Sequence, residues 1–310
     1  MRPSRYVFSA LSLLLAGCAI SPAYVTPGTP NITLASSQQA QFMAADNTAR
    51  PAPWWTFFND ALLTQLINGA LAHNRDIAQA QAALLAARAV FDERQLDRLP
   101  AVTGQAGWQR NRQQTTPDTR TAASSTRLGF DMQWELDLFG RLGHISRSVQ
   151  ARAEAAQADL RQAQLVIAAE VARNYYQALG DQQGLALAQS QVQSWRETVA
   201  LLEARLAAGS GLPEERQNAL ANLVRSEAAL APLQASLRQA QYRLDVLGGQ
   251  APAATALLSN ASAAAPLAGQ LPLGDVNLLI RQRPDVVRAE RLLAASSEDV
   301  GAARAELYPR

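Results

Sequence analysis

The chain lacks lysine entirely and has very little cysteine and histidine. Its 310 residues include one cysteine, two histidines and 28 basic residues, all of them arginine. The absence of lysine excludes a Schiff-base lysine and the lysine of a P-loop. One cysteine and two histidines are too few for a zinc cluster or a disulfide framework. We therefore predict no metal site and no cofactor.

An excess of charge of one sign is also missing. The formal net charge is +2, from 28 arginines and 26 acidic residues. Arg2 and Arg5 lie in a segment that we expect to be removed, which leaves 26 − 26, a balance of zero. A nucleic-acid-binding protein normally carries a basic excess, so we predict no nucleic-acid partner. The apolar share of 48% excludes a disordered chain.

The N-terminus has an apolar run that is too short to span a bilayer. Val7–Ala16 is about ten residues long and indicates a signal peptide over residues 1–17. The sequence LAGC at residues 15–18 resembles a bacterial lipobox, in which Cys18 would carry the acyl chains that anchor the protein. The alternative is an ordinary secretory signal whose only cysteine lies there by coincidence. Residues 19 and 20 are not aspartate, which favours the outer membrane of a Gram-negative cell.

The character of the sequence changes near Trp54. Residues 18–53 are rich in Pro, Thr, Ser and Ala without periodicity, and they are predicted to form a lipid-anchored extended tether. Apolar residues at helical spacing predict helices over residues 60–98. Asp60 should cap the first of these helices, and Pro100 limits the second.

Apolar and polar residues alternate in two stretches of residues 101–138, which predicts a β-hairpin. Residues 111–126 between them are polar and are expected to form a loop. The apolar, membrane-facing side would comprise Trp108, Leu128, Phe130, Met132, Trp134 and Leu136. An amphipathic hairpin packed on a soluble core is one interpretation. The other is a transmembrane hairpin with about 9–11 residues per strand and aromatic girdles, which the second stretch fits closely.

Helical periodicity returns after the hairpin and continues over residues 144–247, which predicts a long helical hairpin. The part from 144 to 208 contains no proline and would form a helix nearly 100 Å long at about 1.5 Å per residue. No compact globular domain needs an element of that length, so a coiled coil or a spanning rod is predicted.

A cluster of turn-forming residues divides this helical hairpin. Gly209, Gly211 and Pro213 predict a sharp turn, after which a second helix should return antiparallel, interrupted by Pro232. Residues 248–275 are rich in Ala, Ser and Pro and are predicted to form a crossover linker.

An internal repeat relates the two ends of the chain. Residues 76–100 and 285–309 align without a gap, because 285 − 76 and 309 − 100 both give 209. Residues 54–247 would then form a first repeat of helix, β-hairpin and long helical hairpin, and residues 276–310 would begin a second. Because the chain stops at Arg310, where a second hairpin should start, we expect a C-terminally incomplete copy.

Five segments of the chain resemble one family, and two of them are specific to it. The specific segments are LRQAQYRLDVLGGQAP and LPLGDVNLLIRQRPDVVRAERLLAASSEDVGAARAELYPR, and WELDLFGRLGH and VARNYYQAL are among the others. Over nearly its whole length the chain resembles outer-membrane efflux lipoproteins. These are TolC-like proteins of the OprM/NodT branch of resistance-nodulation-division systems.

The resemblance implies a mainly α fold with a transmembrane β-hairpin and long antiparallel coiled-coil helices. It implies a homotrimer in the full-length form, with a shared twelve-stranded barrel in outer-membrane lipid and helices that extend into the periplasm. It further implies a passive exit duct for drugs or other small solutes, working with a periplasmic adaptor and an inner-membrane proton-driven pump. A trimer of the 310-residue copy would supply six strands, so we expect that form not to conduct.

The resemblance also assigns roles to individual positions. Cys18 matches the acylated cysteine. Arg205, Gly209 and Gly211 match the tip turn at which the family meets its adaptor. Gly140 and Arg141 match the junction between the β-strand and the helix.

Three other functions remain open at the level of the sequence. An enzyme is disfavoured, because His73 and His144 are isolated at helix ends and Glu135 and Asp137 suit a rim position. A periplasmic adaptor or structural coiled-coil lipoprotein would share the anchor and the helices but would not need the apolar stripe. An exit duct of a type I protein secretion system would differ from the efflux duct mainly in its cargo.

Overall fold

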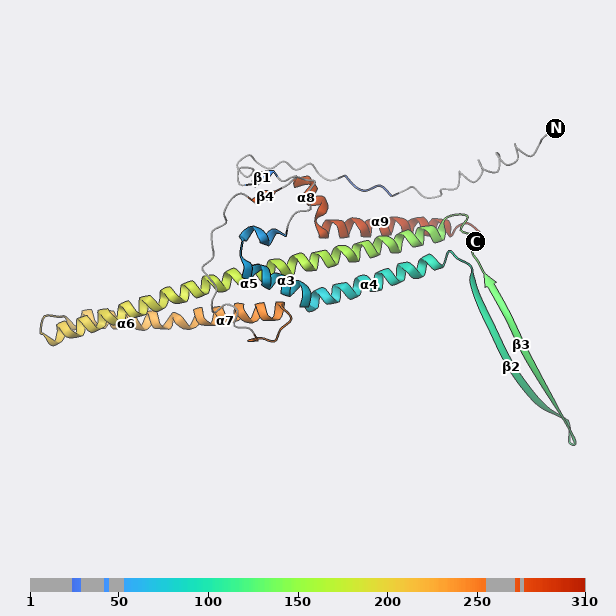
Figure 1. The fold of residues 1–310 in the computed structure, drawn as a ribbon, viewed down its shortest axis with the longest axis horizontal. Helices are drawn as coiled ribbons and strands as arrows, with labels where there is room; N and C mark the ends of the chain where they lie inside the picture. The colour runs from blue at the N-terminus through green and yellow to red at the C-terminus, as the bar shows by residue number, and fades with distance from the viewer. Residues whose placement is uncertain (1–23, 29–41, 45–52, 255–270, 274–275, 310) are drawn as a thin grey trace. The chain divides into compact units, whose positions relative to one another are not determined.

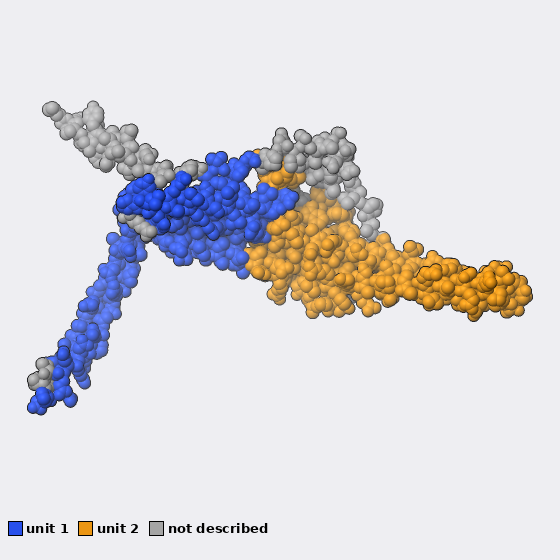
Figure 2. Space-filling view, turned by 180° about the vertical axis from the view of Figure 1, so that it is seen from behind, with its two compact units in different colours: residues 1–29, 82–159, 283–310 blue, residues 30–81, 160–282 orange. Residues whose placement is uncertain are grey.

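The structure is a computed structural model that describes residues 24–28, 42–44, 53–254, 271–273 and 276–309. These residues are mainly helical, and the strands pair into two two-stranded sheets (Figure 1). The chain divides into unit 1, residues 1–29, 82–159 and 283–310, and unit 2, residues 30–81 and 160–282 (Figure 2). Within the described residues, no helix is both long enough and apolar enough to cross a bilayer.

The elements follow the predicted order of helices, β-hairpin and long helical hairpin. The helices are η1 (Trp54–Phe58), α3 (Ala61–His73), α4 (Arg75–Leu96), α5 (Arg141–Ala207), α6 (Pro213–Ala228), α7 (Leu230–Leu247), α8 (Val276–Gln282) and α9 (Pro284–Ala305). The strands are β1 (Phe42–Ala44), β2 (Ala101–Thr116), β3 (Thr119–Gln133) and β4 (Leu271–Leu273). The helices predicted over 60–98 are α3 and α4, and Asn74 separates them.

The long helix α5 has 67 residues, which corresponds to about 100 Å. It begins at Arg141, three residues before the predicted start at His144. The reason is a local cap: the carboxylate of Asp137 accepts hydrogen bonds from the backbone N–H groups of Leu142 and Gly143. A carboxylate at this position satisfies amides that have no partner within the helix.

The return helix runs antiparallel to α5, as cross-helix contacts within unit 2 show. The residue numbers fall on one helix as they rise on the other in the pairs Glu203–Arg216, Arg196–Glu227, Asp181–Ser236 and Glu170–Arg243. The break between α6 and α7 lies at Ala229. Pro232 explains this position, because a proline removes the N–H that would bond the carbonyl four residues earlier and crowds that carbonyl.

The core of unit 2 forms where α3, the start of α4, α5 and α7 meet. Its buried members include Leu63, Ile67, Ile77, Val171, Tyr175, Leu179, Leu244 and Leu247. The Tyr175 hydroxyl donates to Asp60 Oδ2 at 2.7 Å, while Asp60 Oδ1 accepts from the backbone N–H groups of Leu62 and Leu63. Asp60 therefore caps α3, as the sequence predicted, and also joins α3 to α5.

Unit 1 packs α9 against the first part of α5 through small side chains. Ala151, Ala294 and Ala295 are buried together, with Tyr24 packed against them. The Tyr24 hydroxyl also donates to Glu290 Oε1 at 2.7 Å. The helices α4 and α9 each have 22 residues and begin 209 positions apart, since 284 − 75 is 209. This is the offset of the sequence repeat.

The two strands of the hairpin stay paired further toward the turn than the sequence predicted, and the second strand ends earlier. Residues 111–126 were expected to be a loop, but β2 and β3 remain paired through this stretch and reverse only at Pro117 and Asp118. Backbone hydrogen bonds hold an antiparallel pair together whatever the polarity of its side chains, so the polar stretch continues the ladder. At the other end, β3 stops at Gln133 rather than Leu138.

Two short strands lie in segments predicted to be a tether and a crossover linker. Phe42–Ala44 pairs in parallel with Leu271–Leu273 inside unit 2. The predicted tether of residues 18–53 thus includes a paired strand, and so does the linker of residues 248–275. Apolar periodicity could not reveal them, because three residues are too few to show it.

Candidate functional site: the hairpin, its junction and the helical tip

The register of the hairpin gathers apolar residues of both strands on one face. The opposed pairs are Val102–Met132, Gly104–Phe130, Ala106–Leu128 and Trp108–Thr126. Opposed residues of an antiparallel pair point to the same side of the sheet. We define the apolar face as Val102, Ala106, Trp108, Leu128, Phe130 and Met132. Its large side chains are 65–79% exposed, so no described part of the chain covers them.

The opposite face of the hairpin carries no large apolar side chain among the described residues. It carries Thr103, Gln105, Gln109, Asn111, Gln113, Arg127 and Asp131. The side-chain amide of Gln105 donates a hydrogen bond to the Asp131 carboxylate. A strand that separates lipid from water requires this division between its two faces.

Trp134 and Leu136 were predicted as strand residues, and the structure places them just beyond β3. The indole N–H of Trp134 donates to the backbone carbonyl of Arg98 at 3.2 Å, and Trp134 is 54% exposed. Trp134 lies eight positions after Thr126, which is opposite Trp108. Eight residues span about 27 Å of strand, or about 20 Å in height at a tilt of about 40°. An aromatic residue thus lies at each end of a band close to the usual ~25 Å.

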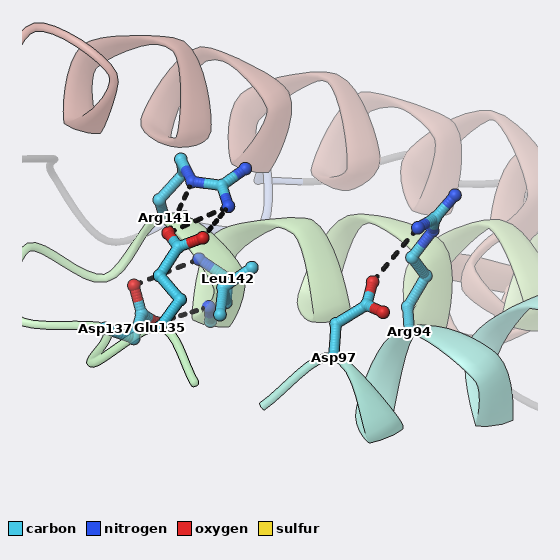
Figure 3. Close-up of polar contacts among 7 residues, drawn as sticks. Arg94, Asp97, Glu135, Asp137, Arg141 and Leu142 are labelled. Atoms are coloured by element: carbon cyan, nitrogen blue, oxygen red, sulfur yellow. Dashed lines mark hydrogen bonds and ion pairs between the residues drawn. The ribbon is translucent and has the colours of Figure 1, made fainter. Parts of the chain in front are cut away.

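The junction between β3 and α5 is fixed by two carboxylates (Figure 3). Arg141 makes a bidentate contact with Glu135, with Nη2–Oε1 and Nη2–Oε2 distances of 2.8 and 2.7 Å. This hydrogen bonding raises the pKa of the Arg141 guanidinium. Asp137 caps α5 at 3.0 Å from Leu142 N and 2.7 Å from Gly143 N. The sequence pointed to Gly140 and Arg141; the structure adds Glu135 as the partner of Arg141 and Asp137 as the cap of α5.

Gly140 adopts a backbone conformation that favours glycine. Its φ is 79°, in the left-handed region. The chain therefore turns sharply between the carboxylates and the first turn of α5. In unit 1 the adjacent Phe139 ring stacks on Tyr308, with ring centroids 4.9 Å apart. The junction thus also contacts the segment that follows α9.

The tip between α5 and α6 needs two glycines for different reasons. Gly209 has φ of 74°, and its N–H donates to the Leu206 carbonyl, while the N–H of Ser210 donates to the Arg205 carbonyl. These two bonds form a Schellman motif, which closes the end of α5. At Gly211, an added Cβ would lie 2.9 Å from the backbone nitrogen of Leu206. The structure thus brings Arg205, Gly209 and Gly211 together in one compact turn.

The side chains at the tip face solvent. Arg205 is exposed, and Leu212, which the sequence analysis did not single out, is 62% exposed. Arg216 contacts Glu203 at 2.8 Å and holds the two helices together behind the turn. The tip is therefore a braced turn whose exposed side chains include Arg205 and Leu212.

A cluster that the sequence did not indicate lies where α9 meets α5 within unit 1. His144, predicted to be isolated, has its Nδ1 2.6 Å from Glu298 Oε2, and Arg147 Nε lies 2.9 Å from the same oxygen. A Cβ added to Gly301 would lie 2.4 Å from His144 Nδ1. His144 is thus a packed and hydrogen-bonded residue. Only the pairing of segments over 150 positions apart reveals its partners.

The sequence also made predictions about a lipid attachment point and about metal-binding side chains. Cys18, the predicted lipid attachment point, lies outside the described residues. Within the described residues, no group of three or more His, Cys, Asp or Glu side chains is arranged to hold a metal ion.

An uncovered apolar hairpin joined to a helical hairpin of this length defines a TolC-like outer-membrane channel fold. Residues 66–250 match the family described as outer membrane efflux protein. Outer membrane protein OprJ of Pseudomonas aeruginosa is 32% identical over 319 residues, which cover 100% of this chain and 66% of OprJ. Cation efflux system protein CusC of Escherichia coli (strain K12) is 29% identical over 316 residues, covering 100% of this chain and 67% of CusC.

A solved structure of the outer-membrane channel OprN matches with a TM-score of 0.83 and 37% identity, over 94% of this chain and 66% of that one. The chain belongs to the outer membrane efflux protein family. It spans about two thirds of the length of these relatives. The family, the fold class and the outer-membrane location predicted from the sequence are confirmed. The relatives are channel proteins rather than enzymes.

Proposed function

We propose that the protein is the passive outer-membrane exit duct of a tripartite efflux system for drugs or other small solutes. The observation that carries this proposal is the apolar face of the hairpin, whose large side chains are 65–79% exposed opposite a polar face. In water such a patch is costly, whereas in lipid it is the favoured surface. In the full-length homotrimer the hairpin would form part of a shared barrel wall.

Arginine substitutions on the two faces of the hairpin test this proposal. Phe130→Arg places a charge on the apolar face, at a cost of about 2–4 kcal/mol near the bilayer midplane. The inserted fraction should then fall by roughly 30- to 700-fold. Gly129→Arg is the matched control. Gly129 lies opposite Gln105 on the polar face, and nothing lies within 4 Å of a Cβ added at Gly129.

The measurement is the protease-protected, outer-membrane-inserted fraction of each variant. Loss of insertion with Phe130→Arg alone supports the duct. Equal insertion of both variants would mean that residue 130 does not face lipid. Equal loss would mean that the hairpin tolerates no added charge on either face, and the assignment of the faces would then be wrong.

We further propose that the tip contacts a periplasmic adaptor, which connects the duct to an inner-membrane proton-driven pump. Arg205, Gly209 and Gly211 form a braced, exposed turn that supports this role. Arg205→Glu should weaken crosslinking to a co-expressed adaptor. Arg238→Glu, at an exposed arginine on α7, should leave it unchanged. Equal effects of the two substitutions would argue against contact at the tip.

We also propose that Cys18 carries the lipid anchor. It is the only cysteine of the chain, so labelled palmitate should be incorporated by the protein and lost completely in Cys18→Ser. Unlabelled wild-type protein would favour the ordinary secretory signal instead.

The cargo we propose is small, and the duct itself would carry out no covalent chemistry. The name of the relative CusC refers to cation efflux, which supports solutes over proteins as cargo. Family membership favours the duct over a periplasmic adaptor or a purely structural lipoprotein.

A further inference from the structure

Beyond Trp108 the apolar face of the hairpin becomes cationic. Arg110 lies opposite Ser124, Arg112 opposite Ala122 and Arg120 opposite Gln114. Residues two apart on a strand share a face, so all three arginines point to the same side as Trp108. All three are exposed. We call Arg110, Arg112 and Arg120 the distal arginines.

The distal arginines have no acidic partner. Asp118, at the turn, is the only acidic residue in 101–130. In the described part of the hairpin, none of the three makes an ion pair, whereas arginines elsewhere in the described chain commonly do. Examples are Arg141 with Glu135, Arg216 with Glu203, Arg243 with Glu170 and Arg288 with Asp159. The missing partner is therefore a local property of this surface.

The charge is confined to one face of the distal hairpin. On the other face, residues 109, 111, 113, 121, 123 and 125 are all uncharged. Arginines needed only for solubility would gain nothing from this segregation. The positive charge is thus directed to the side that carries the apolar band.

Along β2 the order of side chains follows the layers of a membrane surface. The apolar residues Val102 and Ala106 come first, the amphipathic Trp108 follows, and then Arg110 and Arg112. At about 3.4 Å per residue and a tilt of about 40°, the two arginines lie about 5 and 10 Å above Trp108. Aromatic residues mark the boundary of the hydrocarbon, and the headgroup region extends several ångströms beyond it.

We propose that the distal arginines bind the phosphate groups of anionic lipid headgroups in the outer leaflet. This inference rests on the proposed function, because it requires the apolar face to lie in lipid. Guanidinium groups bind phosphate oxygens in a bidentate manner, and each has its donors available here. Lipid phosphates are the occupant because they are anionic and lie at the height of the arginines.

The test uses the full-length form of the protein, reconstituted in phosphatidylcholine vesicles that contain labelled lipid A, whose phosphate monoesters serve as the probe. One variant carries Arg110→Gln, Arg112→Gln and Arg120→Gln. A control carries Arg127→Gln, on the polar face. A second control adds Asn111→Arg, Gln113→Arg and Ala123→Arg to the triple substitution, which restores the net charge on the opposite face.

Each basic residue near an anionic surface contributes about a fivefold gain in binding, so three contribute on the order of 100-fold. Lipid A retention should fall by about this factor in the triple variant. Lipid A retention should be unchanged in Arg127→Gln. It should stay low in the second control, in which three arginines are added on the opposite face. Inorganic phosphate at equal concentration should not compete.

Several results would overturn the inference. They are equal retention by the wild type and the triple variant, full recovery when the charge is moved, and competition by inorganic phosphate. Protease protection in vesicles without lipid A separates the two proposals. If the wild type fails to insert there, the duct and the headgroup site both fail. If it inserts but binds lipid A no better than the triple variant, only the headgroup site fails.

Discussion

Three glycine-to-alanine substitutions in or next to α5 should have different effects, although the chemical change is the same. Gly180 lies inside the helix with nothing within 4 Å of an added Cβ. Gly209 has φ of 74° at the tip. Gly211 has no positive φ, but its added Cβ would meet helix backbone at 2.9 Å. Backbone conformation therefore opposes a side chain at Gly209, lack of space opposes one at Gly211, and neither does so at Gly180.

The expected magnitudes follow from these surroundings. Gly180→Ala should stabilise the helix by about 0.5–1 kcal/mol, because alanine loses less entropy on folding. Gly209→Ala should cost about 1–2 kcal/mol for the left-handed conformation, partly offset by a gain of about 0.4–1 kcal/mol from the unfolded chain. Gly211→Ala should also destabilise the tip, since helix backbone cannot move as easily as a flexible side chain.

Hydrogen exchange of the tip is the suitable assay, because it measures local opening. The Ser210 amide donates to the Arg205 carbonyl at 3.0 Å and reports directly on the end of α5. A net cost near 1 kcal/mol should speed its exchange about fivefold. Gly209→Asn should recover much of this protection, because asparagine tolerates positive φ better than alanine. If Gly209→Ala left exchange unchanged, the conformational reasoning would be refuted.

Other polar contacts give further predictions. Asp137→Ala should destabilise the start of α5 by about 1 kcal/mol, seen as faster exchange in its first turn, whereas Asp137→Asn, with one accepting oxygen instead of two, should keep only one of the two cap hydrogen bonds. Asn74→Ala should lower the free energy of urea unfolding by about 2–3 kcal/mol, because the buried amide caps α4 and donates to the Leu247 carbonyl. Burial and the hydrogen bond to Asp60 raise the pKa of Tyr175. Because the unfolded chain loses this proton first, stability should fall as the pH rises above about 10, and Tyr175→Phe should flatten that fall.

The sequence was a good guide where side-chain period determines structure. Helical spacing predicted the long helix and its return, and Gly209 marked the turn, because left-handed backbone favours glycine. Element boundaries followed less well. The Asp137 carboxylate caps the start of α5 by accepting from amides five and six residues later in the chain. Pro232 interrupts the return helix at Ala229, three residues before the proline. A cap or a steric clash acts on positions offset from the residue that causes it.

The site was predictable in its faces but not in its partners. Alternation identified Trp108, Phe130 and their neighbours, since a strand repeats every two residues. It could not identify Glu298 beside His144, because that contact depends on how α9 packs against α5 within unit 1. The same limit applies to Glu135, whose pairing with Arg141 requires the reversal at Gly140. Contacts across a turn or between distant helices carry no periodic signal.

The length of the hairpin and its surface chemistry have separate physical origins. Backbone pairing sets the length, which is why β2 and β3 continue through the polar residues that alternation predicted to be a loop. Side-chain polarity sets the medium that each part of a face prefers. Since the pairing extends past the apolar band, the distal half must lie beyond the hydrocarbon if the band lies within it. The distal arginines occupy that half, so a lipid-facing hairpin of this length places cationic side chains among headgroups.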